Sequence, residues 1–228
     1  MKKIVIATLA LISIASSAWC QIGSWKAYMA YKDITEIQST GNELFVLASN
    51  NLYQYNQTDQ SITTYDKVSG LCDTYITHIA WCKQAKKLVA VYQNSNIDLV
   101  ETNGNVTNIS DLYNKIMTGN KQVNSITIDG VYAYLACGFG IVKINVSKNE
   151  ITESYIFDFK INRVVIDNGR IYASYGNGVL TASLTDNLID TNNWQTTTSY
   201  PSHLYHQDTT DYDTYLPIVS TLSPGGPK

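Results

Sequence analysis

The sequence predicts an all-β fold assembled from four-stranded antiparallel β-propeller blades. One short opening motif recurs four times, and its first residues are Ile34, Ile76, Val123 and Ile161. These starting points lie 42, 47 and 38 residues apart. Each opening is followed by an apolar strand, a turn rich in Asn or Gly, and another apolar strand. A period of roughly 40 to 50 residues made of short strands is typical of propeller blades.

The first blade shows how the strands are predicted. Its four expected strands are Ile34–Ile37, Leu44–Ser49, Leu52–Asn56 and Ser61–Tyr65. The same reasoning places the blades at about residues 34–66, 76–110, 123–157 and 161–198. Residues 199–228 are expected to form a loop and the start of the next blade. The prediction is therefore about four blades plus the start of a fifth.

The turn between the second and third strands of each blade carries Asn or Gly at the same place in the repeat. These turns are Asn50-Asn51, Asn94-Ser95-Asn96, Gly138-Phe139-Gly140 and Gly176-Asn177-Gly178. Tight hairpins of the primed type need a positive φ at their central residues, which Gly and Asn adopt at the least cost. The pattern therefore predicts one tight hairpin in the middle of each blade.

The connections between blades are expected to be mostly irregular. Residues 111–116 can hold one helical turn, and no longer segment with a helical period is expected after the N-terminal stretch. The segment 215–220 reads as the opening strand of a fifth blade, after a polar loop that begins near Ser199. Because the chain stops at Lys228 inside that unit, we expect an N-terminal piece of a longer protein.

The composition fits exposed sheets joined by polar turns. There are 17 Tyr and 4 Phe, hydrophobic residues make up 44% of the chain, and charged residues make up 15%. This apolar content, with a formal net charge of −3, excludes a disordered chain. No basic cluster exceeds Lys86-Lys87, so nucleic acid is excluded as a partner.

Residues 1–20 read as a cleaved secretory signal peptide. Lys2-Lys3 precede an apolar run, and small residues follow it up to Cys20. Cleavage is expected between Cys20 and Gln21, and the mature chain is then exported to the periplasm or the outer-membrane cell surface. The alternative is a lipoprotein with Cys20 acylated, which the bulky Trp19 disfavours. No later segment is long and apolar enough to span a bilayer.

Cysteine and histidine residues are few. The exported chain keeps Cys72, Cys82 and Cys137. A Cys72–Cys82 disulfide is one interpretation, and buried thiols acting as small hydrophobes are the favoured one. His203 and His206 lie near three aspartates (Asp208, Asp211 and Asp213), but a calcium-loop spacing and a Cys pair are both missing. We therefore expect no metal site and no cofactor.

No catalytic constellation is predicted. Scattered aspartates at expected strand ends are explained by turns and edges rather than by an acid/base pair. Five tyrosines recur near the strands, and their expected role is packing between blades, with sugar stacking as the alternative. They are Tyr53, Tyr92, Tyr134, Tyr172 and Tyr175.

The start of the predicted mature chain, residues 25–31 with Trp25 at its head, leads directly into the first blade. With residues 52–56, 138–145 and 218–224, it resembles the N-terminal β-propeller of PorZ-type proteins, surface components of the type IX secretion system of Bacteroidetes. The resemblance covers about residues 22–228. The blades are also similar in texture to the propeller repeats of two-component regulators.

This resemblance implies one incomplete seven-bladed propeller of a larger, non-catalytic protein. The family's partners are other secretion-complex proteins and anionic lipopolysaccharide, and its association with the membrane is expected only through such partners. No binding residue can be carried over from the family. The alternatives are an extracytoplasmic ligand-sensing propeller of a hybrid two-component regulator and a propeller enzyme.

Overall fold

The computed structural model describes residues 29–198, 200–201, 210–222 and 224. The expected signal peptide with its cleavage site, and Trp25 at the head of the lead-in, lie outside this part. The disfavoured alternatives, acylation of Cys20 and a metal at His203 and His206, also lie outside it. Within it, four antiparallel sheets of four strands confirm the predicted all-β propeller blades. In every sheet the spatial order of the strands follows their order in the chain.

Each sheet is one blade, numbered here from the N-terminus. Blade one contains β1 (Ile34–Ser39), β2 (Glu43–Ala48), β3 (Asn51–Asn56) and β4 (Ile62–Tyr65). Blade two contains β5 (Ile76–Cys82), β6 (Lys87–Tyr92), β7 (Ile97–Glu101) and β8 (Val106–Ile109). Blade three contains β9 (Val123–Asp129), β10 (Tyr132–Cys137), β11 (Gly140–Asn145) and β12 (Glu150–Ile156). Blade four contains β13 (Arg163–Asp167), β14 (Arg170–Tyr175), β15 (Gly178–Ser183) and β16 (Gln195–Thr197).

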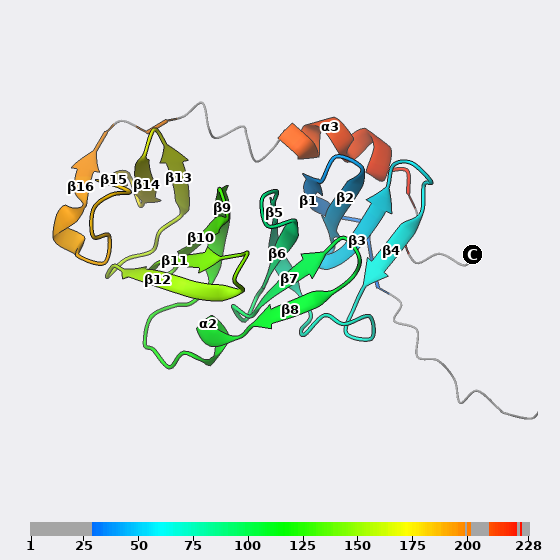
Figure 1. Ribbon diagram of the computed structural model, residues 1–228, viewed down its shortest axis with the longest axis horizontal. Helices are drawn as coiled ribbons and strands as arrows, with labels where there is room; N and C mark the ends of the chain where they lie inside the picture. The colour runs from blue at the N-terminus through cyan, green and yellow to red at the C-terminus, as the bar shows by residue number, and fades with distance from the viewer. Residues whose placement is uncertain (1–28, 199, 202–209, 223, 225–228) are drawn as a thin grey trace, which may run out of the picture.

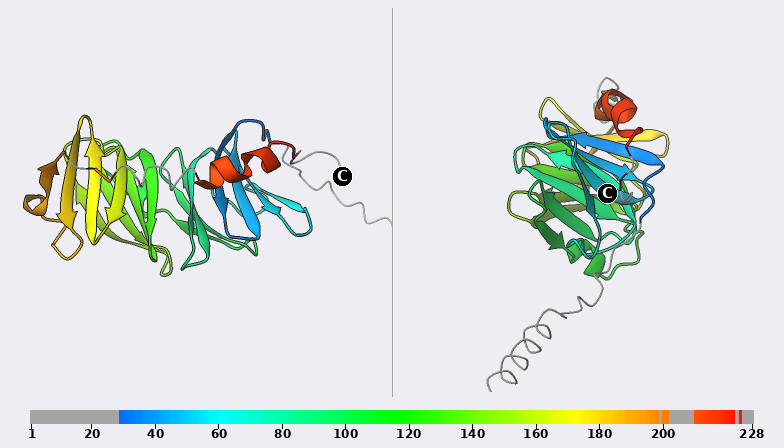
Figure 2. Two further views of the ribbon diagram at one scale, coloured as in Figure 1. Left: turned by 90° about the horizontal axis from the view of Figure 1, so that it is seen from above. Right: turned by 90° about the vertical axis from the view of Figure 1, so that its right-hand side faces the viewer.

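The blades follow one another in an arc, as Figures 1 and 2 show. The first strands of successive blades lie side by side in the order β1, β5, β9, β13 and form the inner edge of the arc. A separate hydrophobic cluster fills each interface between neighbouring blades. The cluster between blades two and three contains Val91, Leu99, Leu135 and Val142. Each blade is therefore stabilised mainly by its nearest neighbours, as in other repeat proteins.

The tight hairpins occur in every blade, with a small shift in the first. Its turn is Ser49-Asn50, with φ of 48° and 62°, one residue earlier than predicted. In blade three, Gly140 has a φ of 146°, and a Cβ there would lie 2.0 Å from the carbonyl oxygen of Tyr155. Only glycine allows β11 to approach β12 this closely.

The helices partly correct the sequence-based expectation. The predicted turn after blade two is α2 (Asp111–Asn114), and a short 3₁₀ turn, η1 (Thr191–Asn193), precedes β16. The segment expected to open a fifth blade is instead helix α3 (Thr210–Val219). No helix in the described ranges is long and apolar enough to cross a membrane.

Helix α3 forms because its apolar residues have a helical spacing. Tyr212, Tyr215, Leu216 and Val219 follow the i, i+3, i+4, i+7 pattern and pack against blade one. Asp211 and Asp213 lie in its first turn, where negative charge stabilises a helix. This face outweighs the unfavourable Pro217 inside the helix. Figure 1 shows α3 lying over β1 and β2.

Candidate binding site at the inner edge of the arc

A cavity lies along the inner edge of the arc. Its volume is about 560 Å³, and β1, β5, β9, β13 and α3 all contribute to its wall. Its lining includes the charged residues Glu36, Arg163 and Asp211 and the polar and aromatic residues Gln38, His78, Trp81, Asn124 and Ser125. The central axis is the usual place for a ligand in a propeller, because loops and inner strands of several blades converge there.

Two side chains of β1 accept hydrogen bonds from the backbone of β5. One oxygen of Glu36 accepts from the backbone N–H of Ile79 at 2.6 Å, and the other lies 2.7 Å from Nδ1 of His78. Gln38 accepts from the backbone N–H of Trp81 at 2.9 Å. These bonds satisfy N–H groups on the free edge of an inner strand, which would otherwise need water or a ligand.

Two side chains of β9 donate to the backbone around β13. The side-chain amide of Asn124 donates to the carbonyl of Ile161 at 2.8 Å. The hydroxyl of Thr127 donates to the carbonyl of Val164 at 2.6 Å. The hydroxyl of Ser125 lies between them in sequence, is buried, and has no hydrogen-bond partner in the described part of the chain. A buried hydroxyl without a partner indicates a place for water or for a polar ligand group.

The polar and aromatic groups of this cavity are held in place by contacts with their neighbours. The carboxylate of Glu36 contacts the imidazole of His78 and accepts from the backbone N–H of Ile79, so this carboxylate is held in the structure. The ring of Trp81 is half-buried and stacks on Phe45, with centroids 5.7 Å apart and planes at 28°. Fixed hydrogen-bonding groups beside an aromatic wall can hold a ligand without offering an activated nucleophile.

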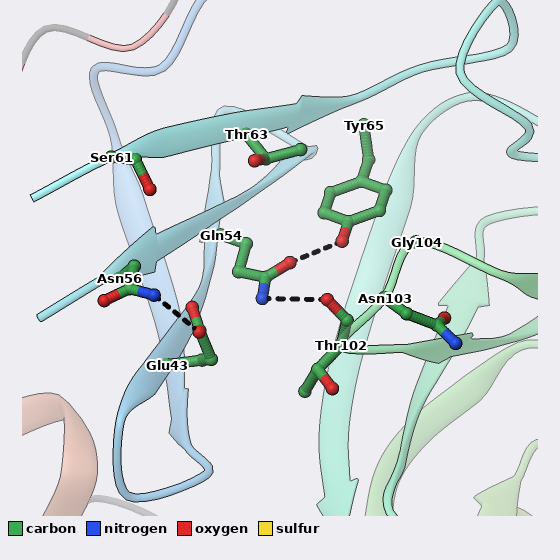
Figure 3. A pocket seen from close by; sticks show the side chains of 9 residues that line it. All are labelled: Glu43, Gln54, Asn56, Ser61, Thr63, Tyr65, Thr102, Asn103 and Gly104. Carbon is green, nitrogen blue, oxygen red and sulfur yellow. Dashed lines mark hydrogen bonds between the residues drawn. The ribbon is translucent and has the colours of Figure 1, made fainter. Parts of the chain in front are cut away.

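A second, smaller cleft of about 230 Å³ lies between strands β2 to β4 of blade one and the β7–β8 turn of blade two (Figure 3). Its polar groups are bonded to one another. The Tyr65 hydroxyl donates to Gln54 at 2.5 Å, and Gln54 donates to the carbonyl of Thr102 at 3.3 Å. Asn56 donates to Glu43 at 2.9 Å. Burial, together with the nearby Glu43 carboxylate, raises the pKa of Tyr65 to about 12. The bond from Gln54 to Thr102 joins blade one to blade two.

The predicted packing role is confirmed for three of the recurring tyrosines. Tyr53, Tyr92 and Tyr134 are at most 2% exposed, so their faces are not available to a sugar. Tyr172 and Tyr175 are half-buried. Tyr175 stacks with Phe159, with ring centroids 4.5 Å apart, at the interface of blades three and four.

Tyr92 belongs to a buried hydrogen-bond network around Asp98, which is fully buried. Asp98 accepts from the Tyr92 hydroxyl at 2.5 Å, from the backbone N–H of Cys72 at 2.8 Å and from Asn108 at 2.8 Å. Burial and the Asp98 carboxylate both raise the pKa of Tyr92 above its usual value. The network holds the loop at Cys72 against blade two.

The cysteines do not form the alternative disulfide. Cys72, Cys82 and Cys137 are free thiols; Cys72 is exposed and the other two are buried, as small hydrophobes would be. Burial raises the pKa of Cys137 to about 12, which keeps this thiol protonated and unreactive. No group of three metal-ligating side chains occurs in the ranges that the structure covers.

The sequence patterns do not by themselves identify the residues that line the cavity at the inner edge of the arc. Glu36, Gln38, Asn124 and Thr127 all lie inside, or directly after, the repeated opening motifs. A polar residue there can be recognised as unusual, because an inner strand is enclosed by its neighbours. Each of these side chains forms a hydrogen bond with a backbone group of the next blade, about 40 residues further along the chain, and the sequence does not show which group this is.

This chain is similar to known proteins in both sequence and fold. Residues 44–195 match the family model of the type IX secretion system PorZ N-terminal β-propeller domain. The chain is similar to the solved structure of PorZ, described as an essential bacterial surface component of the type IX secretion system of Porphyromonas gingivalis. The identity is 30% and the TM-score 0.69, over 77% of this chain and 24% of PorZ. Among curated protein sequences, none matches.

Two more distant structures share the fold. The extracellular domain of the BT4673 hybrid two-component system of B. thetaiotaomicron is 21% identical, with a TM-score of 0.58 over 75% of this chain and 22% of its own. Hydrazine synthase of Kuenenia stuttgartiensis is 16% identical, with a TM-score of 0.53 over 72% of this chain and 49% of its own. At such identities the likeness shows the propeller architecture alone.

Proposed function

Because this chain belongs to the family of PorZ N-terminal β-propeller domains, we propose that it acts by binding, as part of an exported, non-catalytic scaffold of a type IX secretion complex. The family match is the observation that carries this proposal. The chain spans about a quarter of the length of PorZ, so partners of the whole protein are proposed here for the parent protein. Those partners are other proteins of the secretion complex and anionic lipopolysaccharide.

The cavity at the inner edge of the arc supports a binding role. Its hydrogen-bonding side chains hold strand edges, and Glu36 and His78 contact each other between β1 and β5. The flat ring of Trp81 offers an aromatic contact to a partner, and the enclosed hydroxyl of Ser125 leaves a place for water or for a small polar group. We assign to this surface the contact with a hydroxyl-bearing or amide-bearing group of a partner molecule.

We place the protein outside the cytoplasm. PorZ, to which this chain is 30% identical, is described as a bacterial surface component, and this similarity supports the placement. The predicted signal peptide at residues 1–20 is consistent with this proposal. The mass of the mature protein from the native host tests it: a chain starting at Gln21 supports cleavage, and acyl groups on Cys20 support a lipoprotein.

The secretion role is tested by deleting the parent gene in the native host. Cargo of the type IX system should remain unprocessed or unattached at the cell surface, while export across the inner membrane continues. Complementation with Ser125→Ala tests the cavity, and Ser147→Ala, in an exposed turn, is the matched control. Normal attachment of cargo in the deletion strain would discard the secretion role and favour a ligand-sensing propeller of a two-component regulator.

A further inference from the structure

A further cleft, of about 330 Å³, lies where the β6–β7 turn of blade two meets the segment that leads into β9. The hydroxyl of Ser95 in the turn donates to the carbonyl of Lys121 at 2.8 Å, so the two walls are fixed to each other. We call this the amide cleft, and it is lined by Gln93, Asn94, Ser95, Asn120, Lys121 and Gln122.

The amide cleft offers uncharged hydrogen-bonding groups. In the described part of the chain, the side-chain amides of Gln93 and Gln122 have no hydrogen-bond partner. The side-chain oxygen of Asn120 accepts from the backbone N–H of Gln122 at 2.9 Å, which leaves its amide nitrogen free to donate. Side-chain amides both donate and accept, so these groups can bind another amide.

Exposed apolar side chains lie on the blade-three side of the amide cleft. The ammonium of Lys121 donates to the carbonyls of Tyr113 and Lys115, at 2.6 and 3.2 Å, and holds this loop beside the cleft. Tyr113 is 48% exposed and Ile116 is fully exposed. Large apolar side chains held in solvent are typical of binding surfaces, and tyrosine is among their strongest contributors. The same two bonds engage the charge of Lys121, so it is not free to bind an anion.

Tyr75 lies on the other side of the amide cleft, and its backbone is strained. Its carbonyl accepts from the backbone N–H of Gln93 at 3.0 Å, and the following N–H, that of Ile76, donates to the carbonyl of Asn50 at 3.0 Å. Tyr75 has a φ of 68°, a left-handed conformation that is unfavourable for a bulky residue. Its side chain is 51% exposed, so packing in a core does not explain the tyrosine. Backbone strain of this kind is typical of ligand-binding positions.

We propose that the amide cleft binds an extended, uncharged segment of a partner polypeptide. The proposal rests on the binding role proposed above and assigns a surface and a class of partner to it. Each peptide group has one donor and one acceptor, which match the side-chain amides of Gln93, Asn120 and Gln122. Apolar side chains of the segment pack against Tyr75 on one side of the cleft and against Tyr113 on the other.

Photo-crosslinking in the native host identifies what occupies the amide cleft. Benzoylphenylalanine replaces Ile116 in the parent protein, because it keeps an apolar side chain at this position, and mass spectrometry identifies the adduct. The expected adduct is a single polypeptide, crosslinked within one short segment. Ile189, 61% exposed at the opposite end of the blades, is the matched control and should give at least tenfold less of this adduct. A lipid or glycan adduct, no adduct, or equal adducts at both positions would overturn the proposal.

Tyr75→Gly separates binding from folding. Glycine adopts a φ of 68° without strain, so the melting temperature should stay the same or rise. Loss of the ring should lower crosslinking from position 116 roughly tenfold, as for an aromatic residue that contributes strongly to an interface. Lys86→Gly is the matched control: it relieves a φ of 54° at an exposed position at the opposite end of blade two and should leave crosslinking unchanged. Unchanged crosslinking in Tyr75→Gly, or an equal loss in both variants, would contradict the proposal.

Deletion of the parent gene tests the secretion role separately from the amide cleft. Normal cargo attachment in the deletion strain, together with the polypeptide adduct at position 116, would discard the secretion role and support the cleft. Failed cargo attachment without an adduct would support the secretion role and overturn the cleft.

Discussion

At the scale of single residues, the blades depend on a few positions that tolerate only one side chain. Gly140 is the clearest of them, since both its φ of 146° and the 2.0 Å approach of the Tyr155 carbonyl oxygen to an added Cβ exclude other residues. Gly169, in contrast, has a φ of 74° and no atom within 4 Å of an added Cβ. Substitution of these two glycines therefore distinguishes two losses in the free energy of unfolding. At Gly169 the loss comes from backbone conformation alone, and at Gly140 a steric clash is added to it.

Gly140→Ala should destabilise the protein by about 2–4 kcal/mol, because strain and the clash with the Tyr155 carbonyl add together. Gly169→Ala should cost about 1 kcal/mol, from backbone conformation alone. Urea unfolding followed by circular dichroism measures both. Equal losses for the two variants would show that the close approach of β11 and β12 does not matter.

The hydroxyl of Tyr92 makes a measurable contribution through Asp98. Tyr92→Phe should lower the free energy of unfolding by about 1.5–3 kcal/mol, because it removes a hydrogen bond to a buried carboxylate. Tyr53→Phe is the control: Tyr53 is equally buried, but its pKa is raised to about 12 by burial alone. Denaturant titration of the two variants distinguishes the bond from the burial, and similar losses would exclude a role for the bond.

At the scale of elements, polar side chains hold neighbouring inner strands together across the arc. Glu36 and Gln38 accept from β5, and Asn124 donates to the carbonyl of Ile161 directly before β13. These bonds take the place of ladder hydrogen bonds, because the inner strands of adjacent blades are not paired as a sheet. They explain why polar residues occur in motifs that are otherwise apolar.

Glu36 should contribute mainly through its bond to the Ile79 amide. Glu36→Ala should cost roughly 1–3 kcal/mol, because the edge of β5 loses its acceptor. Glu36→Gln keeps an acceptor and loses only the part-exposed pair with His78, so it should cost less than about 1 kcal/mol. His78→Ala should likewise stay near wild type in stability and in cargo attachment. Thermal unfolding measures all three; a larger loss for His78→Ala than for Glu36→Ala would reverse this order.

At the scale of the whole molecule, stability comes from a series of similar interfaces rather than from one central core. Three clusters join consecutive blades, and a fourth joins blade one to α3. Tyrosines are buried in these clusters, including Tyr53, Tyr65, Tyr92, Tyr134 and Tyr155. Their ionisation therefore couples the stability of the arc to pH.

The protein should lose stability at alkaline pH. Burial raises the pKa of Tyr53 and Tyr65 to about 12, above the value of about 10 for an unfolded chain. A raised folded-state pKa stabilises the fold below about pH 10, and this contribution falls as the pH rises toward 12, because the unfolded chain releases its protons first. Melting temperatures at pH 8, 10 and 11 measure the decline. Tyr53→Phe should reduce it and Tyr75→Phe, at a 51% exposed position, should not.

Local patterns in the sequence were sufficient to predict the blades. The repeat period, the alternating apolar residues and the turn residues at Asn50, Gly138 and Gly176 each describe interactions within one blade, so the chain carries them in short stretches. The packing of Tyr53, Tyr92 and Tyr134 was predicted on the same basis and is confirmed. No partner and no binding residue could be predicted in this way.

The tertiary structure decided what depends on contacts between blades. The segment 215–220 could be a strand or a helix, and it is a helix because blade one offers an apolar surface to Tyr212, Leu216 and Val219. The cavity at the inner edge of the arc likewise depends on contacts between blades. Glu36 accepts from the backbone N–H of Ile79, 43 residues away in the chain, and Asn124 donates to the carbonyl of Ile161, 37 residues away. Each blade is determined by patterns within a short stretch of sequence. Contacts between blades, and between blade one and α3, join residues far apart in the chain, so they are determined only by the tertiary structure.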